Sequence, residues 1–148
     1  MHKLAPELSQ ALSIPLVHIA DATGEALVQA GVRRVGLLGT AFTMEQDFYK
    51  GRLTGIHGLE VIVPGEADRS TVHRIIYDEL VAGRIEPSSR EAYRMVIGRL
   101  VADGAQAIIL GCTEIMLLVG QEDSPVPLFD TTAPVSYTHL TLPTIYSV

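Results

Sequence analysis

The sequence of this 148-residue chain predicts an α/β fold, in which helices flank a parallel, Rossmann-like sheet. Two apolar runs of strand length, at residues 33–40 and 107–110, are each followed by glycine or hydroxyl residues and then by a helix-compatible stretch. A third observation is that predicted strands and helices alternate along the chain. Such alternation is typical of a parallel sheet whose two faces are both covered.

Apolar periodicity and capping residues place the individual elements. In chain order they are a helix over 4–12, a strand over 14–19, a helix over 24–30, a strand over 33–40, a helix over 44–53, a strand over 58–64, a helix from 68 or 70 to 83, a helix over 87–101, a strand over 107–110, a helix over 114–118 and a strand over 126–130. Asp21 or Thr23 is expected to cap the helix over 24–30.

Two histidines are interpreted as structural or solvated side chains. His18 lies between apolar residues, which is typical of an ordinary core or loop histidine. The helix that starts at 68 or 70 has one apolar face, and we therefore expect His73 on its exposed side. The residues of that face are Val72, Ile75, Ile76 and Leu80.

Composition excludes several classes of function. The net charge is −6 and the basic residues are scattered, which argues against a nucleic-acid partner. The single cysteine cannot form an internal disulfide. There is no signal-peptide pattern and no apolar stretch near the roughly 18 residues of a membrane span. We expect a cytoplasmic protein with no membrane partner.

Cys112 is the candidate catalytic residue, because it follows a predicted buried strand at the sheet edge where open α/β sheets bind ligands. If it begins a helix, the thiol pKa should fall below its ordinary value of about 8.5. The alternative is that Cys112 is a small buried hydrophobic residue.

The other candidate residues follow the strand at 33–40. Thr40 and Thr43 place hydroxyl groups and free backbone N–H groups together, an arrangement that binds a carboxylate or phosphate. The alternative is that Thr43 and Gln46 form a capping box and bind nothing. No nucleotide-binding motif is present. Arg84 is interpreted as a favourable charge at a helix C-terminus.

Four ordered blocks together resemble the aspartate/glutamate racemase family over roughly residues 1–132. They are residues 36–53, 75–80, 104–115 and 127–131. Within the third block, Glu114 follows Cys-Thr, as in the aspartate racemase branch, whereas the glutamate racemase branch usually has histidine there.

The resemblance implies a racemase that uses neither pyridoxal phosphate nor a metal, and a small amino-acid substrate held between two similar α/β domains. It implies that Cys112 is one of two cysteine bases and that Thr113 binds the substrate carboxylate. Thr40 and Thr43 match the family's hydroxyl loop. Glu114 matches in type, and Arg84 lies near a basic substrate ligand of some relatives. Because family members often pair, the resemblance is compatible with a homodimer.

The resemblance also predicts how the chain is divided. Residues 1–20 are expected to be a remnant of the first racemase domain, 21–120 the second domain and 121–132 a segment returning toward the first. The uncharged residues 133–148 are expected to be a foreign or disordered tail. In the family, the first cysteine lies just before a sequence similar to that of residues 1–3. We therefore expect a fragment that lacks this base and has little racemase activity alone.

Two other functions remain open at this point. A one-cysteine relative, such as a decarboxylase that protonates an enolate from one face, would need only Cys112. A non-catalytic carboxylate-binding α/β module would leave Cys112 with ordinary thiol reactivity.

Overall fold

The computed structural model describes residues 7, 10, 11, 13 and 19–131 of the chain. Residues 7, 10 and 11 are helical, and the rest of the helix expected over 4–12 lies outside the described residues. The strand expected over 14–19 falls almost wholly outside them, as do His18 and the expected tail.

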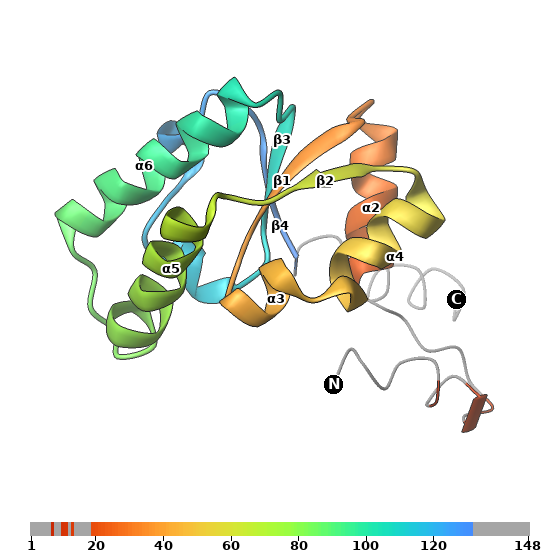
Figure 1. Ribbon diagram of the computed structural model, residues 1–148, viewed down its shortest axis with the longest axis horizontal. Coiled ribbons are helices and arrows are strands. Elements are labelled where there is room, and N and C mark those ends of the chain that lie inside the picture. Colours follow the sequence, from red (N-terminus) through yellow and green to blue (C-terminus); the bar gives the residue numbers. More distant parts are fainter. Residues whose placement is uncertain (1–6, 8–9, 12, 14–18, 132–148) are drawn as a thin grey trace, which may run out of the picture.

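The centre of the fold is a parallel sheet of four strands in the order β2-β1-β3-β4 (Figure 1). The strands are β1 (Arg34–Leu38), β2 (Glu60–Ile62), β3 (Ala107–Leu110) and β4 (Leu128–Asp130). Each neighbouring pair is parallel. All four lie within predicted strands, which confirms the α/β prediction.

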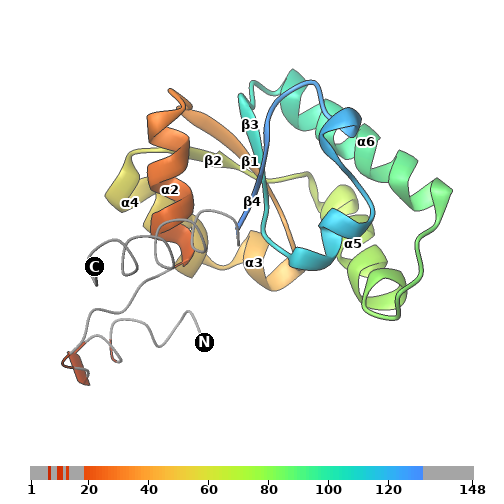
Figure 2. The ribbon, with the colours of Figure 1, turned by 180° about the vertical axis from the view of Figure 1, so that it is seen from behind.

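Helices cover both faces of this sheet (Figures 1 and 2). One face carries α2 (Ile19–Gln29) and α4 (Asp47–His57), and the other carries α5 (Glu66–Ile75) and α6 (Pro87–Ala102). Along β3, Ala107 and Ile109 pack toward α2 and α4, whereas Ile108 and Leu110 pack toward α5 and α6. This alternation explains why the strand reads as a continuous apolar run. The apolar face predicted for the helix that starts at 68 or 70 is confirmed, because its four residues are all buried. They are Val72, Ile75, Ile76 and Leu80.

Helix α2 (Ile19–Gln29) begins earlier than expected, and the prediction that Asp21 or Thr23 caps it is wrong. Thr23 lies inside the helix and its hydroxyl donates to the carbonyl of Ile19. Asp21 instead accepts two hydrogen bonds of 2.7 Å from Arg52 on the neighbouring helix α4. Its carboxylate therefore links helices α2 and α4 and does not cap the end of α2.

The helix expected over 44–53 is two helices, α3 (Ala41–Glu45) and α4 (Asp47–His57). Gln46 between them has an extended backbone, with φ −83° and ψ 148°. The N-cap of α3 is Thr40, so the predicted capping box of Thr43 and Gln46 is wrong.

The helices on the other face match their predictions more closely. Helix α5 (Glu66–Ile75) starts earlier than expected, after Gly65, and continues as the π-helix η2 (Ile76–Leu80). Helix α6 (Pro87–Ala102) has the predicted bounds, with proline in its first turn. The helix expected after Cys112 is the 3₁₀-helix η3 (Thr113–Leu117).

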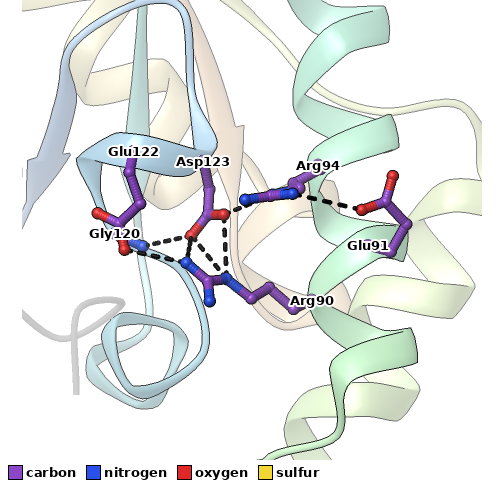
Figure 3. Close-up of polar contacts among 6 residues, drawn as sticks. All are labelled: Arg90, Glu91, Arg94, Gly120, Glu122 and Asp123. Atoms are coloured by element: carbon purple, nitrogen blue, oxygen red, sulfur yellow. Dashed lines mark hydrogen bonds and ion pairs between the residues drawn. The ribbon is translucent and has the colours of Figure 1, made fainter.

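The short 3₁₀-helix η4 (Gln121–Asp123) is tied to α6 by the buried carboxylate of Asp123 (Figure 3). Arg90 donates to it at 3.0 Å, Arg94 at 2.5 Å and the Gly120 N–H at 2.9 Å. Burial acts to raise the pKa of Asp123, but these hydrogen bonds outweigh burial and lower the pKa to about 2.

Among the described helices, none combines the length and the apolar character needed to cross a membrane.

Candidate active site

Two turns meet where β1 and β3 end. We call residues 40–43 the hydroxyl turn and residues 111–114 the thiol turn. Leu38 and Leu110 are paired in the sheet, and the Gly111 N–H donates to the Leu38 carbonyl at 2.7 Å. A Cβ atom at Gly111 would lie only 3.4 Å from Cγ2 of Thr43. The family resemblance assigned residues of both turns to one site, and the structure shows that the two turns adjoin.

In the hydroxyl turn, Thr40 caps helix α3, and the side chain of Thr43 contacts that of Thr40. The Thr43 N–H donates to Thr40 Oγ1 at 3.4 Å, and the two hydroxyl oxygens are 3.2 Å apart. Both side chains are half-buried. Capping therefore takes one lone pair of Thr40 Oγ1. Thr43, through its Cγ2 atom, is the residue of this turn that approaches Gly111 of the thiol turn.

His73 also belongs to this neighbourhood, and its interpretation as a solvated side chain is wrong. Its Nδ1 atom accepts a hydrogen bond of 2.9 Å from the backbone N–H of Ala41, the first residue of α3. Its ring lies against that of Tyr77, with centroids 4.7 Å apart. The helical periodicity of α5 alone could not show this, because α3 covers the side of α5 on which His73 lies.

In the thiol turn, one carboxylate accepts two hydrogen bonds. Cys112 is half-buried and stands at the N-cap position of η3. Its thiol donates to Glu114 Oε2 at 2.7 Å, and the Thr113 hydroxyl donates to the same oxygen at 3.2 Å. Three of the predicted site residues therefore form one connected group.

The predicted lowering of the Cys112 pKa is wrong. Burial, followed by the hydrogen bond to Glu114, raises the pKa of Cys112 to about 11. The same hydrogen bond lowers the pKa of Glu114. The prediction assumed an α-helix dipole, but η3 is a five-residue 3₁₀-helix, and a carboxylate faces the sulfur. At neutral pH the thiol of the described structure keeps its proton.

A buried polar group that sequence reasoning missed lies between α5, η2 and α6. Tyr93 is fully buried and donates to the Val72 carbonyl at 3.1 Å. Its pKa is raised by burial, then by the charges of Cys112 and Glu79. Glu79 is buried and accepts hydrogen bonds from Ser89 and Arg74. Glu79 lies in the π-helix, where ordinary helical spacing no longer predicts which residues face inward.

Among the described residues, the side chain of Arg84 has no hydrogen bond or ion pair with either turn, although its backbone N–H donates to the Glu79 carbonyl at 2.8 Å. Its side chain is 59% exposed and its ion pair, at 4.0 Å, is with Glu86. Nor do the described residues include a cluster of three or more histidine, cysteine or acidic side chains that could hold a metal.

Large apolar side chains are exposed beside both turns. Phe42 on α3 is 50% exposed, and Met116 and Leu117 on η3 are 47% and 57% exposed. The ring of Phe42 contacts that of Phe48, with centroids 5.0 Å apart. Three large apolar side chains that belong to the hydroxyl turn or closely follow the thiol turn are therefore exposed.

Comparison with known proteins identifies similar sequences and structures. Residues 1–135 match the model of the Asp/Glu/hydantoin racemase family. The chain superposes with a TM-score of 0.88 on a Yersinia pestis protein provisionally named an Asp/Glu racemase, at 57% identity. It superposes with a TM-score of 0.87 on an aspartate racemase homologue from Pyrococcus horikoshii OT3, at 34% identity.

Coverage of these relatives is partial. The two superpositions cover 90% and 97% of this chain but 58% and 62% of the two relatives. A Bacillus subtilis broad specificity amino-acid racemase is 26% identical over 135 residues, which are 89% of this chain and 56% of that protein.

Proposed function

The chain belongs to the Asp/Glu/hydantoin racemase family, and from this premise we propose that it supplies one face of a cofactor-independent amino-acid racemase site. In this proposal Cys112 exchanges a proton with the α-carbon of an amino acid of the aspartate or glutamate type. The observation that carries the proposal is the junction of the hydroxyl turn with the thiol turn, where Gly111 places no side chain between them.

The hydroxyl groups are assigned to the substrate's α-carboxylate. Thr40 and Thr43 lie on one side of the junction and Thr113 on the other. Removal of an α-proton beside a carboxylate places negative charge on its oxygens, and fixed donors stabilise that charge. Hydroxyl groups held by the protein in advance need little reorganisation as the charge develops.

Cys112 acts in its protonated form in one direction of the reaction. The thiol gives its proton to one face of the α-carbon and becomes a thiolate, while a base on the opposite face takes the original α-proton. In the other direction Cys112 must be the thiolate. We assign Glu114 to the substrate's ammonium group, because that positive charge would draw the carboxylate from the sulfur and thereby lower the thiol pKa.

A second base must come from outside this chain if the mechanism uses two thiols, because the sequence has one cysteine. We therefore propose that the chain by itself has little racemase activity. Cys112 alone can still remove and return an α-proton on one face, which exchanges the proton with solvent without inverting the centre.

One observation favours a second candidate function. A thiol whose pKa is about 11 is suited to giving a proton, and a decarboxylase that protonates an enolate from one face needs only such an acid. In that reaction a malonate loses carbon dioxide, and the resulting enolate takes the thiol proton.

Incubation of the chain with L-aspartate or L-glutamate in deuterium oxide tests the proposal. We expect slow α-deuteration, measured by proton NMR, with little inversion, measured by chiral chromatography. In a Cys112→Ala variant we expect no α-deuteration. Equal exchange in the variant would contradict the role of Cys112. Rapid inversion by the chain alone would contradict the external base. Carbon dioxide release from a substituted malonate, without exchange of either amino acid, would favour the decarboxylase.

A further inference from the structure

We propose that His73 is a positioning residue of the site, whose neutral ring holds the hydroxyl turn in place beside Cys112. This inference rests on the proposed function, since the turn matters for activity only if it binds the substrate. His73 belongs to neither turn and comes from α5, on the same face of the sheet as α6.

The contact supplies an acceptor that the turn itself lacks. In the first turn of α3, the Thr43 N–H is bound by Thr40 Oγ1 and the Met44 N–H by the Thr40 carbonyl. The Ala41 N–H is bound by His73 Nδ1, from a residue 32 positions away. A five-residue helix has few hydrogen bonds of its own, so this long-range bond fixes the residue next to Thr40.

The hydrogen bond also sets the protonation state of the ring. An Nδ1 atom that accepts a hydrogen bond carries no proton, so the proton of the neutral ring is on Nε2. Tyr77, four residues on, lies against the ring and limits its rotation. Protonation of Nδ1 would bring two donors face to face and release the Ala41 N–H. The contact therefore requires an Nδ1 atom without a proton.

Three ion pairs also hold α5 against its neighbours, and none of them involves His73. The ion pairs join α5 to α3, to α6 and to η2. They are Arg69 with Glu45, Arg99 with Asp68, and Arg74 with Glu79.

Three variants of the full chain separate positioning from packing. His73→Asn keeps an acceptor, because Oδ1 of asparagine takes the place of Nδ1. His73→Leu keeps bulk but removes the acceptor. Thr71→Val is the matched control on the same helix, since its hydroxyl bonds only the Ala67 carbonyl one turn back. We measure hydrogen exchange of the Ala41 amide by NMR and the affinity for L-aspartate by titration.

We expect His73→Leu to speed Ala41 exchange and to weaken L-aspartate binding by about three- to tenfold, the range of one lost hydrogen bond. His73→Asn should stay within about twofold of wild type, and Thr71→Val should match wild type.

Two results would overturn the inference: unchanged Ala41 exchange in His73→Leu, or equal losses in the leucine and asparagine variants, which would indicate packing alone. If wild type binds neither aspartate nor glutamate, the proposed function fails. The Ala41 exchange data would still decide whether His73 holds the turn.

Discussion

The thiol of Cys112 lies 2.7 Å from Oε2 of Glu114, two residues further along the chain, and donates its hydrogen to that oxygen. The acidity of the candidate catalytic group is therefore set partly by a residue of the same turn. Since burial is the first cause of the raised pKa and Glu114 the second, a change at Glu114 should lower the pKa only in part.

Glu114→Gln is expected to make Cys112 more reactive. A neutral amide removes the negative charge beside the sulfur, so the thiol pKa should fall below about 11. A decrease of one unit in the thiol pKa gives about ten times more thiolate at pH 8. The measurement is the rate of iodoacetamide alkylation between pH 6 and 11. Glu122→Gln is the control, because that carboxylate pairs with Arg90 on α6. Identical pH profiles for wild type and Glu114→Gln would contradict the assignment.

Gly111→Ala is expected to disturb the junction of the two turns. The added Cβ would lie 2.9 Å from the Leu38 carbonyl oxygen, which is closer than real Cβ atoms approach. We expect a loss of about 1–3 kcal/mol in the free energy of unfolding, measured in urea. Gly98→Ala is the control, since its Cβ would meet nothing within 4 Å in helix α6. It should gain about 0.5–1 kcal/mol. A neutral Gly111→Ala would mean that the strand ends are farther apart than described.

The two turns could each be predicted from the sequence, because each follows an apolar run of strand length. The apolar runs that became β1 and β3 are buried on both sides, and the carboxyl ends of parallel strands lie together. That β1 and β3 are neighbours did not follow from the pattern, because β2 lies between them in the chain.

Features that depend on contacts between distant side chains could not be predicted. The bond from Ala41 to His73 joins residues 32 positions apart, and no local pattern marks either of them. The pKa of Cys112 depends on which way Glu114 turns. The break at Gln46 has no proline or glycine to signal it. The first helix also begins earlier than expected, with Thr40 as its N-cap.

Asp123→Asn is expected to loosen η4 from α6. The carboxylate accepts hydrogen bonds from Arg90 and Arg94, and bonds to charged groups contribute about 2 kcal/mol. Because the pKa of Asp123 is lowered to about 2 in the folded chain, its contribution is complete above the ordinary value of 3.8. The contribution is lost as pH falls from about 4 toward 2. The stability of wild type should therefore fall in that window more steeply than that of the variant.

The control for this change is Glu91→Gln, which alters a neighbouring carboxylate in the same group of side chains (Figure 3). Glu91 is 64% exposed and pairs with Arg94 at 3.6 Å. Exposed pairs contribute little, so we expect a change below about 0.5 kcal/mol. Urea unfolding at pH 7 and pH 3 measures both variants. An equal loss in the two would mean that the burial of Asp123 is unimportant.

Thr40→Val and Thr43→Val are expected to differ in their effects on stability and to agree in their effects on binding. Thr40→Val removes the N-cap of α3, because its oxygen accepts the Thr43 N–H, and a lost cap costs about 1 kcal/mol. Thr43→Val removes only a hydroxyl group, so its unfolding free energy should stay within about 0.5 kcal/mol of wild type. Both variants should bind L-aspartate more weakly, because each loses a hydroxyl donor assigned to the substrate carboxylate. Urea unfolding and L-aspartate titration measure the two effects separately. Full affinity in Thr43→Val would restrict the role of the hydroxyl turn to capping.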